Sequence, residues 1–185
     1  MEENLKYKLI GNVDALKPKT STTSCNCETM LNDLITKELE SANIYKVFAG
    51  WCNQKGYRYA GELMLKYSNE EITHADRHIE YMDKRIIRAR VNMIPKPEPC
   101  EFSGIREVIQ AGYNHERLIS EAYKGACKTA LDGSEFMLFT HLQWYVTEQV
   151  EEEYKFSTLL DYCNLLNDVQ DYPARVEDYI KENYL

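Results

Sequence analysis

Six polar side chains occupy positions that the spacing of their apolar neighbours assigns to the inner faces of helices. They are Glu38, Glu71, His74, Glu116, Gln149 and Glu152. Each interrupts, near its middle, an apolar stripe that advances in steps of three and four residues. Glu71 and His74 are three residues apart, so their side chains share one face of a helix. Carboxylates and an imidazole that meet inside a bundle are typical ligands of divalent metal ions.

Burial of these carboxylates requires a nearby positive charge. An ionised carboxylate is very costly to bury alone, and repulsion among the four glutamates adds to that cost. No Lys or Arg occupies the same core-face positions, so we expect the counter-charge to be metal. Four carboxylates with one imidazole match two divalent ions. A carboxylate that bridges ions about 3.5–4 Å apart allows both to give electrons to one oxidant.

The polar groups recur along the chain with a period of 78 residues. A shift of 78 places Glu38 on Glu116 and Tyr45 on Tyr123. The other pairs under this shift are Tyr67 with Tyr145, Glu70 with Glu148, Glu71 with Gln149, and His74 with Glu152. We interpret the chain as two related helical hairpins that pack about a pseudo-two-fold axis and bring their polar groups together.

A polar core without metal is the alternative to this interpretation. The Glu-x-x-His spacing is frequent by chance, and polar core groups can pair with water and each other to give conformational specificity. The two further core-face glutamates and the 78-residue repeat favour the metal centre. We interpret His78 as a helix-packing or surface residue rather than a ligand, and His115 and His141 as surface or interface groups.

The elements that position these groups follow from the helix breakers. Prolines at 18, 95, 97, 99 and 173 leave two long proline-free stretches, which Gln54-Lys55-Gly56 and Asp132-Gly133 each divide once. This pattern predicts helices over about 28–54, 58–88, 103–131 and 134–165. A short fifth helix is expected from Pro173 through Ile180. The predicted fold is an all-α up-down four-helix bundle with a long crossover between its second and third helices.

Composition excludes several other classes of protein. The 185 residues carry a net charge of −8 and are 44% apolar, which fits one domain with a sizeable core. The acidic balance disfavours nucleic acid or an anionic membrane as partner. We find no stretch of membrane-spanning length and no signal peptide, and expect a cytoplasmic protein with reduced cysteines. We divide the chain into a polar extension, 1–24, and a helical domain, 25–185.

Four segments resemble the non-haem ferritins, in particular the bacterial-type cage-forming ones. These segments are KELESANIYKVFAGWC, NEEITHADRHIEYM, YNHERLI and HLQWYVTEQVEEE, which fall within residues 28–165. The resemblance implies a ferroxidase centre that oxidises Fe(II) with O2 or H2O2. It also implies a hollow homo-oligomeric shell of 24 subunits that stores ferric mineral.

The resemblance also implies roles for individual residues. Glu38, Glu71 and His74 would hold the first iron, with Glu71 bridging to the second. The second iron would be bound by Glu116, with Gln149 and Glu152 completing its surroundings. A third iron position of bacterial-type ferritins corresponds to Glu70, Glu148, Glu151 and Glu152. Tyr45 resembles the family's electron-donating tyrosine, and Trp144 is a second candidate; for Tyr45, a core aromatic role is an equal alternative.

Differences from related families narrow the subfamily that the resemblance implies. Bacterioferritins and rubrerythrins carry a second Glu-x-x-His in the fourth helix, but here Glu148 is followed by Glu151 at that spacing. Ile72 stands where haem-binding bacterioferritins have methionine, so no haem is expected. The carboxylates that line the three-fold channel of animal ferritins correspond to Phe139 and Leu142, which suggests another iron entry route.

Three functions are compatible with these residues. The first is an iron-storage ferritin with ferroxidase activity. The second is a di-iron oxidase or peroxidase without mineral storage, which Gln149 and the fifth helix disfavour. The third is a structural bundle with a degenerate centre, which the intact Glu38, Glu71, His74 and Glu116 disfavour.

Overall fold

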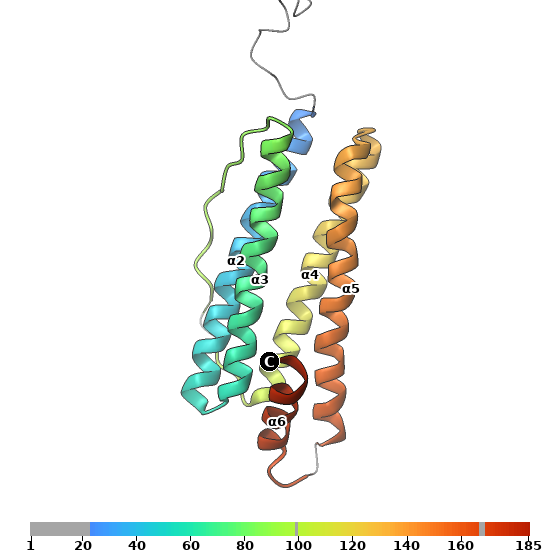
Figure 1. The fold of residues 1–185 in the computed structure, drawn as a ribbon. Helices are drawn as coiled ribbons and strands as arrows, with labels where there is room; N and C mark the ends of the chain where they lie inside the picture. Colours follow the sequence, from blue (N-terminus) through green and yellow to red (C-terminus); the bar gives the residue numbers. More distant parts are fainter. Residues whose placement is uncertain (1–22, 99, 167–168) are drawn as a thin grey trace, which may run out of the picture.

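The computed structural model describes residues 23–98, 100–166 and 169–185. Its elements are the helices α2 (Cys25–Lys55), α3 (Arg58–Lys84), α4 (Ile105–Asp132), α5 (Phe136–Leu165) and α6 (Tyr172–Tyr184). Helices α2 and α3 form one antiparallel hairpin, and α4 and α5 form the other (Figure 1). The predicted four-helix bundle with a short fifth helix is confirmed. The predicted extension, 1–24, lies outside the described residues except for Thr23 and Ser24.

The segment between α3 and α4 is the predicted crossover. It runs the length of the bundle along the first hairpin, so that α3 and α4 point in the same direction (Figure 1). Its backbone is tied to α2, because the Arg90 amide donates to Asn32 Oδ1 at 2.5 Å and the Asn92 amide donates to Thr36 Oγ1 at 2.9 Å. These bonds satisfy backbone donors that an extended segment cannot satisfy within itself.

The breaks between the helices lie where predicted, but several helix ends differ from prediction by up to four residues. Gly56 ends α2 with φ 87°, the left-handed conformation expected of a glycine at a helix C-terminus. At the second break, Gly133 keeps a right-handed φ of −83°, and Ser134 takes the left-handed conformation with φ 56°. Helix α3 ends at Lys84, four residues before the predicted end, and Ile86 follows with φ 59°.

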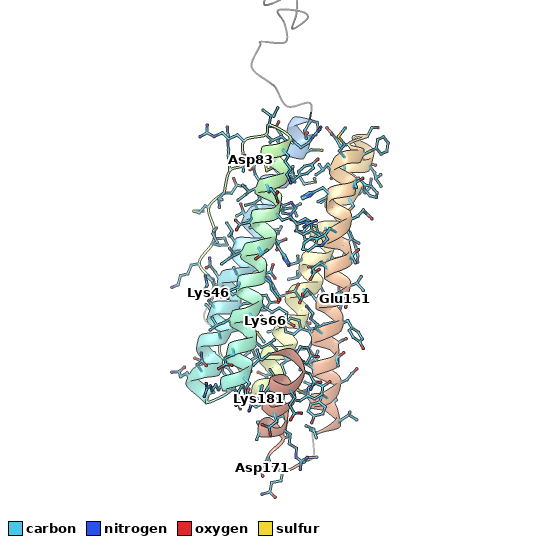
Figure 2. All side chains as sticks on the ribbon, viewed as in Figure 1. Lys46, Lys66, Asp83, Glu151, Asp171 and Lys181 are labelled. Atoms are coloured by element: carbon cyan, nitrogen blue, oxygen red, sulfur yellow. The ribbon has the colours of Figure 1, made fainter. Side chains whose placement is uncertain are left out.

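The apolar core consists of two clusters with polar side chains between them. One cluster lies toward α6 and includes Tyr45, Tyr67 and Phe156, and the other includes Tyr123 and Tyr145. Side chains fill the space between the two hairpins in Figure 2. Cys27, Cys52, Cys100, Cys127 and Cys163 are free thiols, as predicted for these five.

Helix α6 docks on the start of α3 through a buried glutamate. Glu177 accepts the backbone N–H groups of Tyr59 at 2.8 Å and Ala60 at 2.7 Å. Tyr57, the residue before α3, provides no side-chain cap, so Glu177 supplies the acceptor that a helix N-terminus requires. Val176 and Ile180 are fully buried beside it.

Candidate metal centre

Glu38 on α2 and Glu71 and His74 on α3 form a compact group. Each offers one ligand atom, and these atoms lie within 4.8 Å of one another. All three side chains are buried. Glu71 Oε2 is 3.2 Å from His74 Nδ1, as expected for an i, i+3 pair on one helix face. Within the described residues, no other set of three or more His, Cys, Asp or Glu residues converges this closely.

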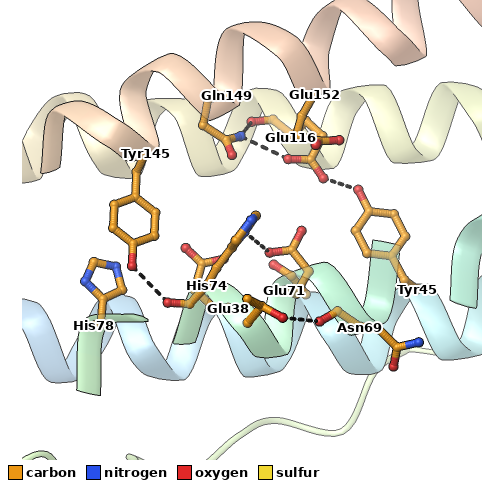
Figure 3. Close-up of polar contacts among 12 residues, drawn as sticks. Glu38, Tyr45, Asn69, Glu71, His74, His78, Glu116, Tyr145, Gln149 and Glu152 are labelled. Atoms are coloured by element: carbon orange, nitrogen blue, oxygen red, sulfur yellow. Dashed lines mark hydrogen bonds and ion pairs between the residues drawn. The ribbon is translucent and has the colours of Figure 1, made fainter. Parts of the chain in front are cut away.

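The second hairpin presents Glu116, Gln149 and Glu152 toward this group (Figure 3). Gln149 Nε2 donates to Glu116 Oε2 at 2.9 Å and to the Glu116 carbonyl at 3.1 Å. All three side chains are buried. The polar residues of four different helices therefore meet in the middle of the bundle, where the sequence places them.

The tyrosines of the repeat exchange hydrogen bonds between the hairpins. The Tyr45 hydroxyl on α2 donates to Glu116 on α4, and the Tyr123 hydroxyl on α4 donates to Glu38 on α2. Each tyrosine thus binds the glutamate of the other half, which is the reciprocity that a pseudo-two-fold axis requires. The sequence pairs Tyr45 with Tyr123, but assigns a role only to Tyr45. The repeat itself was the signal that could have identified Tyr123 as a partner of Glu38.

The carboxyl groups are held in surroundings that disfavour their charged forms. Burial, followed by the charge of Glu71, raises the pKa of Glu38 well above its usual value. Burial, followed by the charge of Glu116, does the same to the pKa of Glu71. Burial raises the pKa of Glu152 to about 7. A bound cation would reverse these shifts because it stabilises the ionised carboxylates.

Unpartnered oxygens lie among these groups and supply a test of whether a metal fits. Glu38 Oε2, Glu152 Oε2 and Glu70 Oε2 are buried and accept no hydrogen bond in the structure. Buried polar atoms are seldom left without a partner. Hard oxygen donors beside one imidazole suit iron in both oxidation states, so the residues present fit a metal centre.

A cation that the core-face positions did not predict lies beside Glu152. Lys155, one turn after Glu152 on α5, places its Nζ 2.7 Å from Glu152 Oε1. Its side chain is 34% exposed, so a long stem reaches inward from the edge of the bundle. The absence of Lys and Arg from the core-face stripes did not exclude this cation, because Lys155 lies beside the stripe rather than on it.

The four residues predicted to bind a third iron differ in their exposure to solvent. Glu70 and Glu148 are half-buried, Glu152 is buried, and Glu151 is exposed on α5 (Figure 2). Trp144 is half-buried, and its ring centroid is 5.4 Å from that of His74. The third position and the redox roles of Tyr45 and Trp144 stay predictions.

The remaining histidines make more specific contacts than predicted. His78 is fully buried and lies 2.9 Å from the Tyr123 hydroxyl through Nε2. Its Nδ1 is 3.1 Å from His141 Nε2, and His141 is only half-buried. His115 lies 2.8 Å from Ser41 Oγ. The helix-packing interpretation is correct for His78, but it omits the hydrogen bonds.

Phe139 and Leu142, which correspond to the channel carboxylates of animal ferritins, both contact the chain's own core. Leu142 is fully buried in the chain's own core, and Phe139 packs against the same cluster. Neither residue supplies a carboxylate, so entry of iron by another route stays a prediction. The exposed apolar residues at this end of α5 are Phe136 and Met137, each about two-thirds exposed at 65% and 64%.

The fold and the site define a helical bundle with a buried carboxylate and histidine centre. The chain belongs to the ferritin family, since the ferritin-like domain matches residues 28–166. A probable bacterial non-heme ferritin-like protein of Haemophilus influenzae is 32% identical over 143 residues, covering 77% of this chain and 86% of that protein. The bacterial non-heme ferritin of Escherichia coli O157:H7 is 31% identical over 135 residues, covering 73% and 81%.

Solved structures support the fold. The open pore ferritin of Archaeoglobus fulgidus superposes with a TM-score of 0.82 at 22% identity, covering 87% of this chain and 98% of that one. No helix among the described residues combines the length and apolar character needed to cross a membrane.

Proposed function

We propose that the protein is an iron-storage ferritin with ferroxidase activity. The observation that carries the proposal is the buried group of Glu38, Glu71 and His74, which faces Glu116 and Glu152 in a chain of the ferritin family. Its substrate is Fe(II), its oxidant is O2 or H2O2, and its product is ferric oxyhydroxide.

In this proposal, each side chain has a separate role in binding iron. Glu38 and His74 hold the first Fe(II), and Glu71 bridges to the second. Glu116 binds the second Fe(II), with Gln149 fixing one Glu116 oxygen and Glu152 completing the surroundings. Two Fe(II) ions bound there would supply two electrons, which together with two protons from solvent reduce O2 to H2O2. Apolar clusters on either side of the centre exclude bulk water from it.

Storage and assembly extend the proposal beyond one chain. A homo-oligomeric shell of 24 subunits in the cytoplasm would receive the ferric product in its cavity. The relatives' names and the matching fold support this part. A di-iron oxidase without mineral storage is the alternative that the experiment separates from it.

The test is an aerobic titration of the apoprotein with Fe(II), following oxygen consumption and ferric absorbance. The wild type is expected to oxidise two irons per chain rapidly and then to keep accumulating soluble ferric iron. Glu71→Ala is expected to lose the rapid phase because it removes the bridging carboxylate. Glu80→Ala is the matched control, since Glu80 lies on the same helix with its side chain 63% exposed.

The outcomes separate the three functions. Uptake that stops at two irons per chain indicates a di-iron oxidase without storage. Oxidation by the wild type that is no faster than by Glu71→Ala indicates a polar core without catalytic metal.

A further inference from the structure

A continuous series of hydrogen bonds connects Glu38 with the edge of the bundle. Tyr123 donates to Glu38 Oε1, His78 Nε2 lies 2.9 Å from the Tyr123 oxygen, and His141 Nε2 lies 3.1 Å from His78 Nδ1. His78 is fully buried, whereas His141 is half-buried. Three side chains from α3, α4 and α5 thus link one predicted metal ligand to the periphery.

The donor and acceptor atoms of these side chains orient every hydrogen bond of the series in the same direction. Tyr123 has a single hydroxyl hydrogen, which it donates to Glu38, so its oxygen accepts from His78 Nε2–H. Burial, followed by His141, His74 and Arg77, lowers the pKa of His78 well below its usual value. The neutral ring then has a lone pair on Nδ1 and accepts from His141 Nε2–H. Every hydrogen in the series points toward Glu38.

This direction leaves Glu38 with one oxygen committed to Tyr123 and one oxygen that accepts no hydrogen bond. Oε1 accepts from Tyr123, whereas Oε2 is buried without a partner. A carboxylate oxygen of Glu38 lies within 4.8 Å of the ligand atoms of Glu71 and His74. A carboxylate fixed through one oxygen loses less conformational freedom when its other oxygen binds a metal, which is how outer residues orient ligands.

The equivalent position in the other half of the repeat shows that the aromatic stack does not require a histidine. The 78-residue shift places His78 on Phe156. His78 stacks on Tyr145 with centroids 4.1 Å apart, and Phe156 stacks on Tyr67 with centroids 4.8 Å apart. Both halves therefore have an aromatic stack at this place, and phenylalanine suffices to build one. The imidazole adds hydrogen bonding to Tyr123, which Phe156 cannot offer to Tyr45.

We propose that His78 and His141 are positioning residues that act through Tyr123 to orient Glu38 for the first metal ion. This inference rests on the proposed metal centre. It makes the two metal positions unequal, because the series supports Glu38 and has no counterpart at Glu116.

Two substitutions of His78 separate hydrogen bonding from packing. His78→Gln can donate to the Tyr123 oxygen and accept from His141, but it lacks a ring. His78→Phe reproduces the ring of Phe156 but neither hydrogen bond. The measurement is calorimetric titration of each full-length apoprotein with Zn(II) alone, with His74→Ala used to identify the step that belongs to the Glu38 position.

The expected result is that His78→Phe weakens this step by roughly three- to tenfold, the factor carried by one net hydrogen bond, and that His78→Gln restores it. A binding constant that stays unchanged in His78→Phe overturns the inference. So does a loss in His78→Gln larger than in His78→Phe, since that pattern shows a packing role. A wild type that binds no Zn(II) overturns the proposed metal centre together with this inference.

A second pair of variants covers the case in which His78 variants fail to fold. Tyr123→Phe and Tyr45→Phe each remove one hydroxyl from equivalent places in the two halves. Tyr123→Phe is expected to weaken the Glu38 step about tenfold, as loss of an outer ligand partner does, whereas Tyr45→Phe weakens the other step. Equal effects on both steps from either variant would contradict the inference.

Discussion

Glu38 illustrates how a side chain can be destabilising for the empty protein and necessary for its proposed function. Its carboxyl group is completely enclosed, and one of its oxygens has no partner. Burial and the neighbouring Glu71 favour the protonated form, as the raised pKa indicates. Substitution by the neutral glutamine keeps the shape and an oxygen that can accept from Tyr123, and so isolates the effect of charge.

We predict that Glu38→Gln stabilises the apoprotein at high pH but not at low pH. Below the ordinary pKa of 4.5, Glu38 is protonated in the folded and the unfolded chain, and its favourable contribution is fully present. As pH rises, the unfolded chain loses the proton first, so this contribution to the free energy of unfolding is lost as pH passes through the raised folded pKa. The difference in Tm, variant minus wild type, should therefore grow between pH 5 and pH 8.

The measurement is thermal unfolding of both apoproteins across this range. A change of about 1 kcal/mol moves the Tm of a domain of this size by roughly 2–4 °C, so the difference should reach a few degrees. The histidines with lowered pKa are the same in both proteins and cancel in the comparison. Glu80→Gln is the exposed control, and a difference in Tm that does not depend on pH would contradict the prediction.

Helix α3 is capped at its start by a residue of helix α6 rather than by a residue close to it in the sequence. The start of α3 has no capping side chain of its own, and Glu177 provides the acceptor from a helix more than a hundred residues later. A negative charge at this end also interacts favourably with the helix dipole.

We predict that Glu177→Ala lowers the free energy of unfolding by about 2 kcal/mol, because two N–H groups at the start of α3 lose their acceptor. Hydrogen exchange should accelerate at the Tyr59 and Ala60 amides more than at the middle of α3. Glu182→Ala is the matched control, since Glu182 lies on α6 and is exposed. Unchanged protection of both amides would show that another group caps the helix.

The whole molecule carries apolar surface that a lone chain would expose to water. Leu118 is 68% exposed beside a groove that Ile44, Val47 and Pro95 also line, and Leu165 is 80% exposed. Large exposed apolar patches mark interaction surfaces. Contacts between copies of the chain in the proposed shell would bury such residues.

We predict that the purified protein sediments as a closed assembly of about 24 chains of 21.7 kDa. Leu118→Glu should shift the population to smaller species, because the substitution introduces charge at an apolar contact. Sedimentation velocity measures both. Leu65→Glu, at a residue 43% exposed outside the groove, is the control. A wild type that sediments as a monomer would contradict the proposed shell.

The helices and the central polar residues could be predicted from the amino-acid sequence alone. Proline and glycine placed the helix breaks within a few residues, and three- and four-residue apolar steps assigned Glu38, Glu71, His74, Glu116, Gln149 and Glu152 to inner faces. Both signals are local, because backbone restriction and helical periodicity act over a few residues. The 78-residue repeat further indicated that the two hairpins are related.

The hydrogen-bond partners of these residues could not be predicted without the packing of the helices. That Tyr123 binds Glu38, that His78 and His141 continue from Tyr123, and that Lys155 reaches Glu152 depend on how four helices are rotated and how long side chains bend. Helical periodicity gives the face on which a residue lies but not the reach of its side chain or the atom it meets on another helix. Hydrogen bonds have narrow limits of distance and angle, so small changes in packing decide which of them form.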